Sequence, residues 1–338
     1  MKHRVLTLLI VLLAALSIFL YEILWAPNTF EGDRFVIVSK GDSYTQVVNT
    51  MEEAGIIRNR FLFDIAGRIL NLTTKMQIGK YRFRSGMSNK ELLEDLRYGK
   101  TIELVTVTIP EGLKASRHAK IFVQALGIDS ARYMSFVNDT AFVRSLNISA
   151  KSLEGYLMPN TYQLYWQTNE EDVIKEQVKE FWSAFNDTLR AVAEQAGRSI
   201  TEVLTMASIV EKETSIDSER AIITGVYYNR LQKRMRLEAD PTIQYMLEDG
   251  PRRLHYGDLQ RESDYNTYRH YGLPPGPISN PGKASILAAL YPEKSKFLFF
   301  VANGLGGHTF SRTYEEHQKA VKQFRKFRAE QEALKEEG

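Results

Sequence analysis

The chain has 338 residues, enough for one large or two moderate globular domains with a substantial core. Its 43% hydrophobic and 25% charged residues are ordinary for a globular protein and exclude wholesale disorder. A formal net charge of +3 does not indicate nucleic-acid binding. The absence of cysteine excludes thiol nucleophiles, disulfides and cysteine-ligated metal sites, and it is compatible with an oxidising compartment without requiring one.

The N-terminus has the pattern of a membrane anchor. Lys2 and Arg4 precede an apolar run over Val5–Tyr21 that continues, after one glutamate, to Trp25 and Ala26. This length is close to the roughly 20 residues that cross a bilayer as a helix. The basic flank predicts a cytoplasmic N-terminus, with everything after residue 27 outside the cytoplasmic (inner) membrane. The alternative is a cleaved signal peptide, but no convincing small-x-small cleavage site follows, so an uncleaved single-pass anchor is favoured.

Residues 29–107 are predicted to form a small α+β module. Alternating side chains over residues 35–40 predict a first strand, and residues 77–84 predict another. Helix-start signals precede three predicted helices: Ser43 with Gln46, Asn59, and Ser88 with Glu91. The module contains no cluster of reactive residues, so a binding or spacing role is expected.

A β-branched run over residues 102–109 ends at Pro110 and predicts a strand followed by a turn. We place the domain boundary there. Helical stretches follow, interrupted by Gly/Pro-rich segments such as Gly272–Gly282, and a charged amphipathic helix is expected from Tyr314 onward. The predicted fold class is therefore α+β, with an N-terminal transmembrane helix over 1–28, a small module over 29–107 and a larger mixed α+β domain over 108–338.

One predicted helix, which starts at a capping box on Ser199, contains the clearest candidate chemistry. An apolar stripe with helical spacing is formed by Val203, Met206, Ala207 and Val210. Thr205 and Ser208 point away from this stripe, while Glu211 and Glu213 fall on its opposite flanks. The two glutamates therefore cannot both face one reacting atom, and they do not form the paired carboxylates of an ordinary glycosidase.

A carboxyl group at the border of an apolar stripe is a candidate general acid, because partial desolvation raises its pKa and keeps a proton available near neutrality. A glutamate beside a lysine near a helix end is more often a solvated side chain or a salt-bridge partner. Spacing alone does not decide between these roles for Glu211 or Glu213.

The ordered motifs of the chain resemble the MltG/YceG-like endolytic murein transglycosylases. The blocks that carry this resemblance are Leu153-Glu-Gly-Tyr-Leu-Met-Pro-Asn-Thr-Tyr162, Ala207-Ser-Ile-Val-Glu-Lys-Glu-Thr214, Ser218-Glu-Arg220, Val226-Tyr-Tyr-Asn-Arg-Leu231, Met235-Arg-Leu-Glu-Ala-Asp-Pro-Thr242, Tyr265-Asn-Thr-Tyr268, Gly272-Leu-Pro-Pro-Gly276, Ile278-Ser-Asn-Pro-Gly282, Phe299-Phe-Val-Ala-Asn303 and Gly307-His-Thr-Phe310. Together they extend over nearly the whole chain. Asn160 departs from the family pattern, which often has aspartate there.

The resemblance implies a catalytic role for Glu213, the second glutamate of the Glu-Lys-Glu motif, and implies that the small module is LysM-like. It also implies an endolytic lytic transglycosylase that cleaves MurNAc–GlcNAc bonds of peptidoglycan and leaves 1,6-anhydro-MurNAc ends. One carboxylic acid suffices because the C6 hydroxyl of the sugar is a tethered nucleophile with a high effective concentration. The resemblance further implies that the protein acts beside penicillin-binding proteins and terminates or trims nascent glycan strands.

Polar and aromatic residues near the catalytic motifs are candidates for substrate binding: Asp240, Thr242, Tyr265, Asn266 and Tyr268. The alternative for each is loop stabilisation by local hydrogen bonds. Glu154 is either a second carboxylate or the structural partner of a nearby arginine. Six scattered histidines without ligand spacing do not indicate zinc, and no metal or cofactor is expected.

Two other functions remain open from the sequence. One is a hydrolytic muramidase in which Asp240 or Glu154 assists Glu213. The other is a membrane-anchored, wall-binding scaffold without enzymatic activity. A muramidase would leave reducing ends on digested glycan strands, whereas a transglycosylase leaves anhydro-MurNAc ends. A scaffold without activity would be unaffected by Glu213→Gln.

Overall fold

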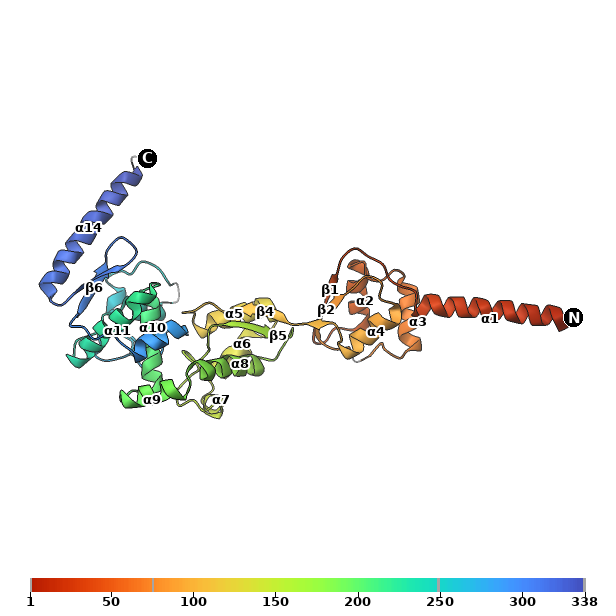
Figure 1. Ribbon diagram of the computed structural model, residues 1–338, viewed down its shortest axis with the longest axis horizontal. Helices are drawn as coiled ribbons and strands as arrows, with labels where there is room; N and C mark the ends of the chain where they lie inside the picture. Colours follow the sequence, from red (N-terminus) through yellow and green to blue (C-terminus); the bar gives the residue numbers. More distant parts are fainter. Residues whose placement is uncertain (1, 75, 248–249, 337–338) are drawn as a thin grey trace. The chain divides into compact units, whose positions relative to one another are not determined.

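A computed structural model of the protein describes residues 2–74, 76–247 and 250–336. The predicted segments 1–28 and 108–338 therefore each end outside the described residues, at Met1 and at residues 337–338. The protein is a mixed α+β chain that divides into two compact units (Figure 1). The first unit comprises Met1–Val107, Phe122–Ile128 and Tyr162–Asn169. The second comprises Thr108–Ile121, Asp129–Thr161 and Glu170–Gly338.

The first helix of the chain has the length and composition of a membrane span. α1 covers Lys2–Leu24, and within its segment His3–Leu24 an 18-residue stretch has a mean hydropathy of 2.5 with almost no burial within the protein. Its last residues differ from the rest, because Ile23 and Leu24 are buried in the hydrophobic core of the first unit. The predicted apolar helix is therefore confirmed, and its end is part of a folded unit.

The part of the first unit between α1 and residue 103 is a three-stranded antiparallel sheet with three helices. β1 (Arg34–Val38) pairs with β2 (Gly79–Phe83), which pairs with β3 (Ile102–Glu103). The helices are α2 (Tyr44–Glu53), α3 (Arg60–Ile69) and α4 (Asn89–Tyr98). Both predicted capping boxes form, and Asn59 caps α3, because these side chains accept bonds from backbone N–H groups that the first helical turn leaves without partners.

The predicted single strand over residues 102–109 is wrong. It divides into β3 and β4 (Val105–Thr108), which join different sheets. β3 pairs with β2, whereas β4 pairs with β5 (Thr161–Leu164). The β-branched composition predicts extended backbone correctly, but it carries no information about which partner each half finds.

The second unit is mainly helical. Before the catalytic motif come α5 (Ala115–Leu126), α6 (Ser130–Asn138), α7 (Thr140–Ser145), α8 (Glu170–Ala184) and α9 (Asp187–Gln195). The end of α5, from Phe122 onward, belongs to the first unit. α10 (Ile200–Glu213) follows and packs against α11 (Asp217–Gln232), α12 (Asp240–Met246) and α13 (Lys283–Leu290). A short 3₁₀ turn, η1, covers Asp258–Gln260.

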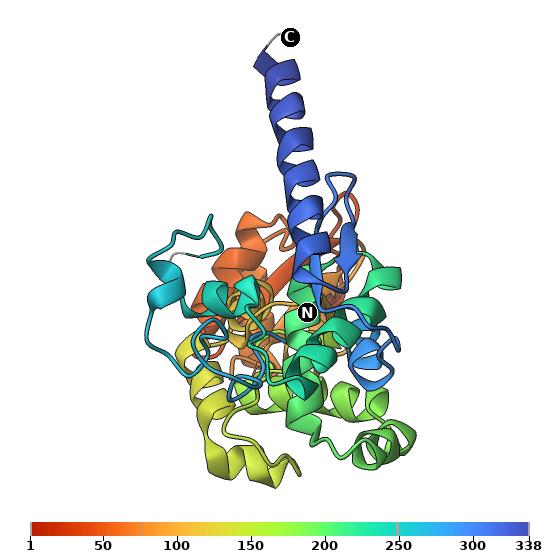
Figure 2. The same ribbon diagram turned by 90° about the vertical axis from the view of Figure 1, so that its left-hand side faces the viewer.

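A hairpin and a long helix complete the second unit. β6 (Phe299–Ala302) pairs antiparallel with β7 (His308–Ser311). The predicted C-terminal helix is confirmed as α14 (Tyr314–Glu336). Its first turns pack on the hairpin, and Figure 2 shows the rest of the helix projecting from the unit, as it does in Figure 1.

α10 is buried more completely than its apolar stripe predicts. Every residue from Val203 to Val210 is buried, including Thr205 and Ser208 on the side expected to point away from the core. The hydroxyl of Thr205 donates to the Thr201 carbonyl, and the hydroxyl of Ser208 donates to the Thr205 carbonyl and accepts from the Ile278 amide. Satisfied hydroxyls can be buried at low cost, so α10 is the central helix of this unit.

Candidate functional site

Glu213 is the last residue of α10, at the point where the central helix ends. The Tyr227 hydroxyl, from α11, donates a hydrogen bond of 2.5 Å to Glu213 Oε1. The Tyr227 ring is itself buried and meets the Phe300 ring edge to face, with 5.7 Å between the centroids. Two helices and a strand therefore fix the orientation of this one carboxyl group.

The environment of Glu213 favours its protonated form. Burial, together with the neighbouring Asp240 carboxylate, raises the pKa of Glu213 to about 7, against the opposing effects of the Tyr227 hydroxyl and the Arg230 charge. Burial and the Glu213 carboxylate raise the pKa of Tyr227 well above its usual range, so this phenol stays a donor. Glu213 is thus a carboxylic acid that holds a transferable proton near neutral pH.

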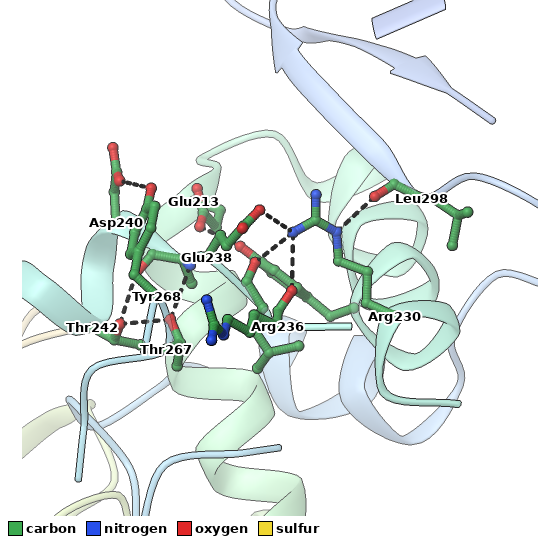
Figure 3. A network of polar contacts seen from close by, with 12 residues as sticks. Glu213, Arg230, Arg236, Glu238, Asp240, Thr242, Thr267, Tyr268 and Leu298 are labelled. Atoms are coloured by element: carbon green, nitrogen blue, oxygen red, sulfur yellow. Dashed lines mark hydrogen bonds and ion pairs between the residues drawn. The ribbon is translucent and has the colours of Figure 1, made fainter. Parts of the chain in front are cut away.

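Arg230 lies one turn after Tyr227 on α11 and organises the backbone beside Glu213. Its guanidinium donates to the carbonyls of Leu298, Arg236 and Leu237, at 2.7, 3.1 and 2.9 Å. It also pairs with Glu238 at 3.2 Å (Figure 3). Arg230 is 8% exposed, so this buried cation ties the segment before α12 to the segment before β6.

Asp240 and Tyr268, both predicted to bind substrate, lie together beside Glu213 (Figure 3). The Tyr268 hydroxyl donates to Asp240 Oδ1 at 2.5 Å. Burial and the Asp240 carboxylate raise the pKa of Tyr268, and Glu213 contributes to the same effect. Asp240 is exposed at the first position of α12. An acid, a carboxylate and a phenol therefore converge at one accessible place.

Thr242 and Asn266, also predicted to bind substrate, are fully buried. The Thr242 hydroxyl donates to the Ala239 carbonyl and bonds the Thr267 hydroxyl at 2.9 Å. The Asn266 amide donates to the carbonyls of Leu259 and Arg261. Their side chains hold the loops that carry Asp240 and Tyr268, so we do not include them in the proposed binding surface.

Tyr265, the remaining predicted binding residue, lies in a different group of side chains. Its half-buried ring packs against Tyr245, with 4.8 Å between the centroids. The Lys114 ammonium lies 4.6 Å from the centroid of the Tyr245 ring and donates to the Tyr245 carbonyl. Neighbouring aromatic rings beside a cation are suited to sugar rings, so Tyr265 stays a candidate for binding.

Glu211 has partners quite different from those of Glu213. It forms a buried ion pair with Arg220 at 3.1 Å, in which the two side chains are 7% and 6% exposed. Its second oxygen accepts from the Gly282 amide at 3.0 Å, and Arg220 also donates to the Ser285 hydroxyl. This arrangement joins α10, α11 and the start of α13. Glu211 is therefore a structural residue.

Glu154 is a half-buried carboxyl that accepts hydrogen bonds from amide groups. It accepts from the Ala115 amide at 3.0 Å and from the Asn280 side-chain amide at 2.8 Å. Burial raises the pKa of Glu154 to about 7, against the opposing effects of these two donors and of Lys114. The Ala115 contact is with the first residue of α5, so Glu154 holds the start of that helix.

The sequence reasoning missed the roles of Tyr227 and Arg230. The spacing of Tyr227 and Arg230 offered a signal: they are three positions apart, so they share one face of the helix that follows the Glu213 helix. His308 is bound elsewhere: its Nδ1 lies 2.7 Å from Glu219 Oε2. Among the described residues no group of three or more His, Cys, Asp or Glu side chains is arranged to hold a metal ion.

Comparison with known proteins identifies the family. A model of the YceG-like family matches residues 36–323, which is most of the chain. The chain belongs to the YceG-like family. The match includes α10 with Glu213, α11 with Tyr227 and Arg230, and most of the first unit after α1.

Several YceG-like relatives have curated names or known structures. An endolytic murein transglycosylase of Bacillus subtilis is 30% identical over 302 residues, with 85% of this chain and 83% of the relative covered. One of Streptococcus pneumoniae is 28% identical over 318 residues, and the chain spans 57% of its length. A crystal structure of a YceG-like protein from Listeria monocytogenes has a TM-score of 0.62 and 35% identity, covering 86% of this chain and 99% of that one.

Proposed function

We propose that this YceG-like protein is an endolytic peptidoglycan lytic transglycosylase that cleaves MurNAc–GlcNAc bonds within glycan strands. The observation that carries the proposal is the position of Glu213 at the end of α10, hydrogen-bonded to Tyr227 and with a pKa raised to about 7 by burial, beside accessible Asp240 and Tyr268. The curated names of the Bacillus subtilis and Streptococcus pneumoniae relatives support the substrate class.

In the first step Glu213 donates its proton to the bridging oxygen between MurNAc C1 and GlcNAc C4. Tyr227 already donates to Oε1, so the transferable proton is placed on Oε2. Protonation lets the C1–oxygen bond break, and positive charge develops at the anomeric carbon. Asp240 is the negative group near enough to favour this charge, since it already acts on the pKa of Glu213.

In the second step the ionised Glu213 removes the proton from the C6 hydroxyl of the same MurNAc. The C6 oxygen forms a bond to C1, which closes the 1,6-anhydro ring and returns the proton to Glu213. No water enters the product. The nucleophile is already attached to the substrate, so proximity replaces the second carboxylate of a hydrolase.

We further propose that the protein is a single-pass protein of the cytoplasmic membrane, with the second unit and the part of the first unit after α1 on the extracytoplasmic side. α1 is the anchor: its span His3–Leu24 is long and apolar enough to cross a bilayer. Arg4 lies at the N-terminal end of this span, in agreement with a cytoplasmic N-terminus.

The folded part of the first unit is proposed to be LysM-like and to bind glycan. Its strands β1 and β2 pair antiparallel with α2 and α3 between them in the chain. A hollow in this unit is lined by polar residues of the β1–α2 loop and by the segment before β2, among them Ser39, Asp42, Ser43 and Thr73. Work beside penicillin-binding proteins, which sets the length of nascent strands, is part of the same proposal.

The test is digestion of purified peptidoglycan by the full chain in detergent micelles, with the product ends identified by mass spectrometry. Wild type is expected to give 1,6-anhydro-MurNAc ends, and Glu213→Gln is expected to give none while it remains folded. Glu194→Gln, an exposed change on α9, is the matched control and should cleave normally. Unchanged products from a folded Glu213→Gln variant would contradict the proposal.

A further inference from the structure

The C-terminal end of α1 is fixed to the first unit by several contacts. Ile23 is 2% exposed, and its carbonyl accepts from the Asn89 side-chain amide at 2.9 Å. Glu22 forms an ion pair with Arg58. Packing of α1 against α3 and α4 adds to these bonds. The helix that we propose to cross the membrane therefore continues into a folded unit without a flexible linker.

A buried asparagine locks the segment after α1. Asn28 is 2% exposed; its Oδ1 accepts from the Arg58 amide at 2.9 Å, and its Nδ2 donates to Asn89 Oδ1 and to the Met87 carbonyl, both at 3.0 Å. All hydrogen-bonding groups of this side chain are thus used within the unit. The surface of the unit that surrounds α1 must lie close to the bilayer.

α3 lies at the end of the first unit from which α1 projects (Figure 1). One face of α3 carries exposed apolar side chains. Phe61 is 68% exposed and Ile69 is 52% exposed, with half-buried Ile65 between them. Spacings of four residues place these side chains on one side of the helix. Arg68, seven residues after Phe61, is exposed on that same side.

We propose that the face formed by Phe61, Ile65, Arg68 and Ile69 binds the phospholipid of the outer leaflet at the boundary between headgroups and acyl chains. Exposed apolar side chains on a helix, with an arginine among them, are typical of a helix that lies in this boundary. Trp25, 49% exposed directly after α1, has the amphipathic ring that is enriched at the same depth. The inference rests on the proposed membrane anchor, because α1 brings this face to the bilayer.

The consequence is a first unit held to the membrane at two places, α1 and α3. A unit attached through one helix can rotate about its axis and tilt. A second apolar contact beside the helix stops the tilt and fixes the height of the unit above the bilayer.

The experiment uses single-cysteine variants of the full chain, which contains no native cysteine, labelled with an environment-sensitive fluorophore and reconstituted in phosphatidylglycerol–phosphatidylethanolamine nanodiscs. The test site is Phe61→Cys. Ile37→Cys is the matched control, an exposed apolar position (41%) on β1, which lies toward the opposite end of the unit from α1 in Figure 1. Leu13→Cys within α1 reports whether the anchor spans the bilayer.

Spin-labelled lipids are expected to quench the label at residue 13 strongly. They should quench the label at residue 61 at least threefold more than the label at residue 37. For residue 61, a spin label near the headgroup should quench more than one deeper in the acyl chains. Strong quenching at residue 13 with equal values at residues 61 and 37 would overturn the lipid contact and leave the anchor intact. No quenching at residue 13 would overturn the anchor and, with it, the inference. A blue-shifted but unquenched label at residue 61 would indicate contact with a second protein copy and would also overturn it.

Discussion

Glu213→Gln is expected to change the stability of the protein in a pH-dependent way. Burial raises the pKa of Glu213 from an ordinary 4.5 to about 7 in the folded protein. Below about pH 4 this carboxyl is protonated in both the folded and the unfolded protein, so it does not lower the free energy of unfolding. As pH rises from about 4.5 to 7, the unfolded chain releases this proton and the folded chain does not, so wild type loses stability. Glutamine does not ionise and avoids this loss.

The size of the effect follows from the two pKa values. Each pKa unit corresponds to about 1.4 kcal/mol, so the full difference is about 3 kcal/mol above pH 7 and nearly zero below pH 4. The Tyr227 hydroxyl can still donate to the amide oxygen of glutamine, so little of the change comes from a lost hydrogen bond. The variant should thus be inactive and more stable than wild type at pH 8.

Urea unfolding followed by circular dichroism at pH 4, 6 and 8 measures this effect. We expect the free energy of unfolding of Glu213→Gln to exceed that of wild type by an amount that grows with pH and levels off above pH 7. Glu194→Gln should follow wild type at every pH. A variant that is less stable than wild type at pH 8 would contradict a raised pKa of Glu213 in the folded protein, and with it the role of general acid.

Three further substitutions test the surroundings of Glu213. Tyr227→Phe removes a donor that lowers the pKa of Glu213, so the upper limb of the pH–rate profile should move to higher pH. The value of kcat should fall about 10- to 100-fold, the range for one hydrogen bond to a charged group. An upper limb at the wild-type pH would contradict the hydrogen bond between Tyr227 and Glu213. Asp240→Asn removes a charge that raises the same pKa, so that limb should move to lower pH; steady-state rates between pH 5 and 9 check both. Arg220→Met leaves Glu211 buried without its cation and should cost about 3–5 kcal/mol in urea unfolding, with the specific activity of the folded fraction retained; equal stability would contradict the buried pair.

Local signals in the sequence predict the helices well. Ser43, Ser88 and Ser199 each start a helix with a capping box, because the whole motif lies within one turn of backbone. The apolar run of α1 and the position of Glu213 at the end of α10 were also predictable, although the catalytic role of Glu213 came from the resemblance and stays a proposal.

Contacts between elements could not be predicted in the same way. The bond from Tyr227 to Glu213 depends on how α11 crosses α10, which no spacing along the chain specifies. The strand predicted over residues 102–109 divides because its halves find partners far apart in the sequence. Thr242 and Asn266 have the polar side chains of binding residues, but loop packing buries them, and composition does not distinguish a buried amide from an exposed one.

The central claim is that Glu213 transfers a proton while the sugar supplies its own nucleophile. Digestion of peptidoglycan in water enriched in ¹⁸O, followed by mass spectrometry of the released muropeptides, tests it directly. We predict end groups lighter by one water molecule than reducing ends, with no ¹⁸O incorporated. Reducing MurNAc ends that carry one ¹⁸O at C1 would show that water is the nucleophile and would contradict the account.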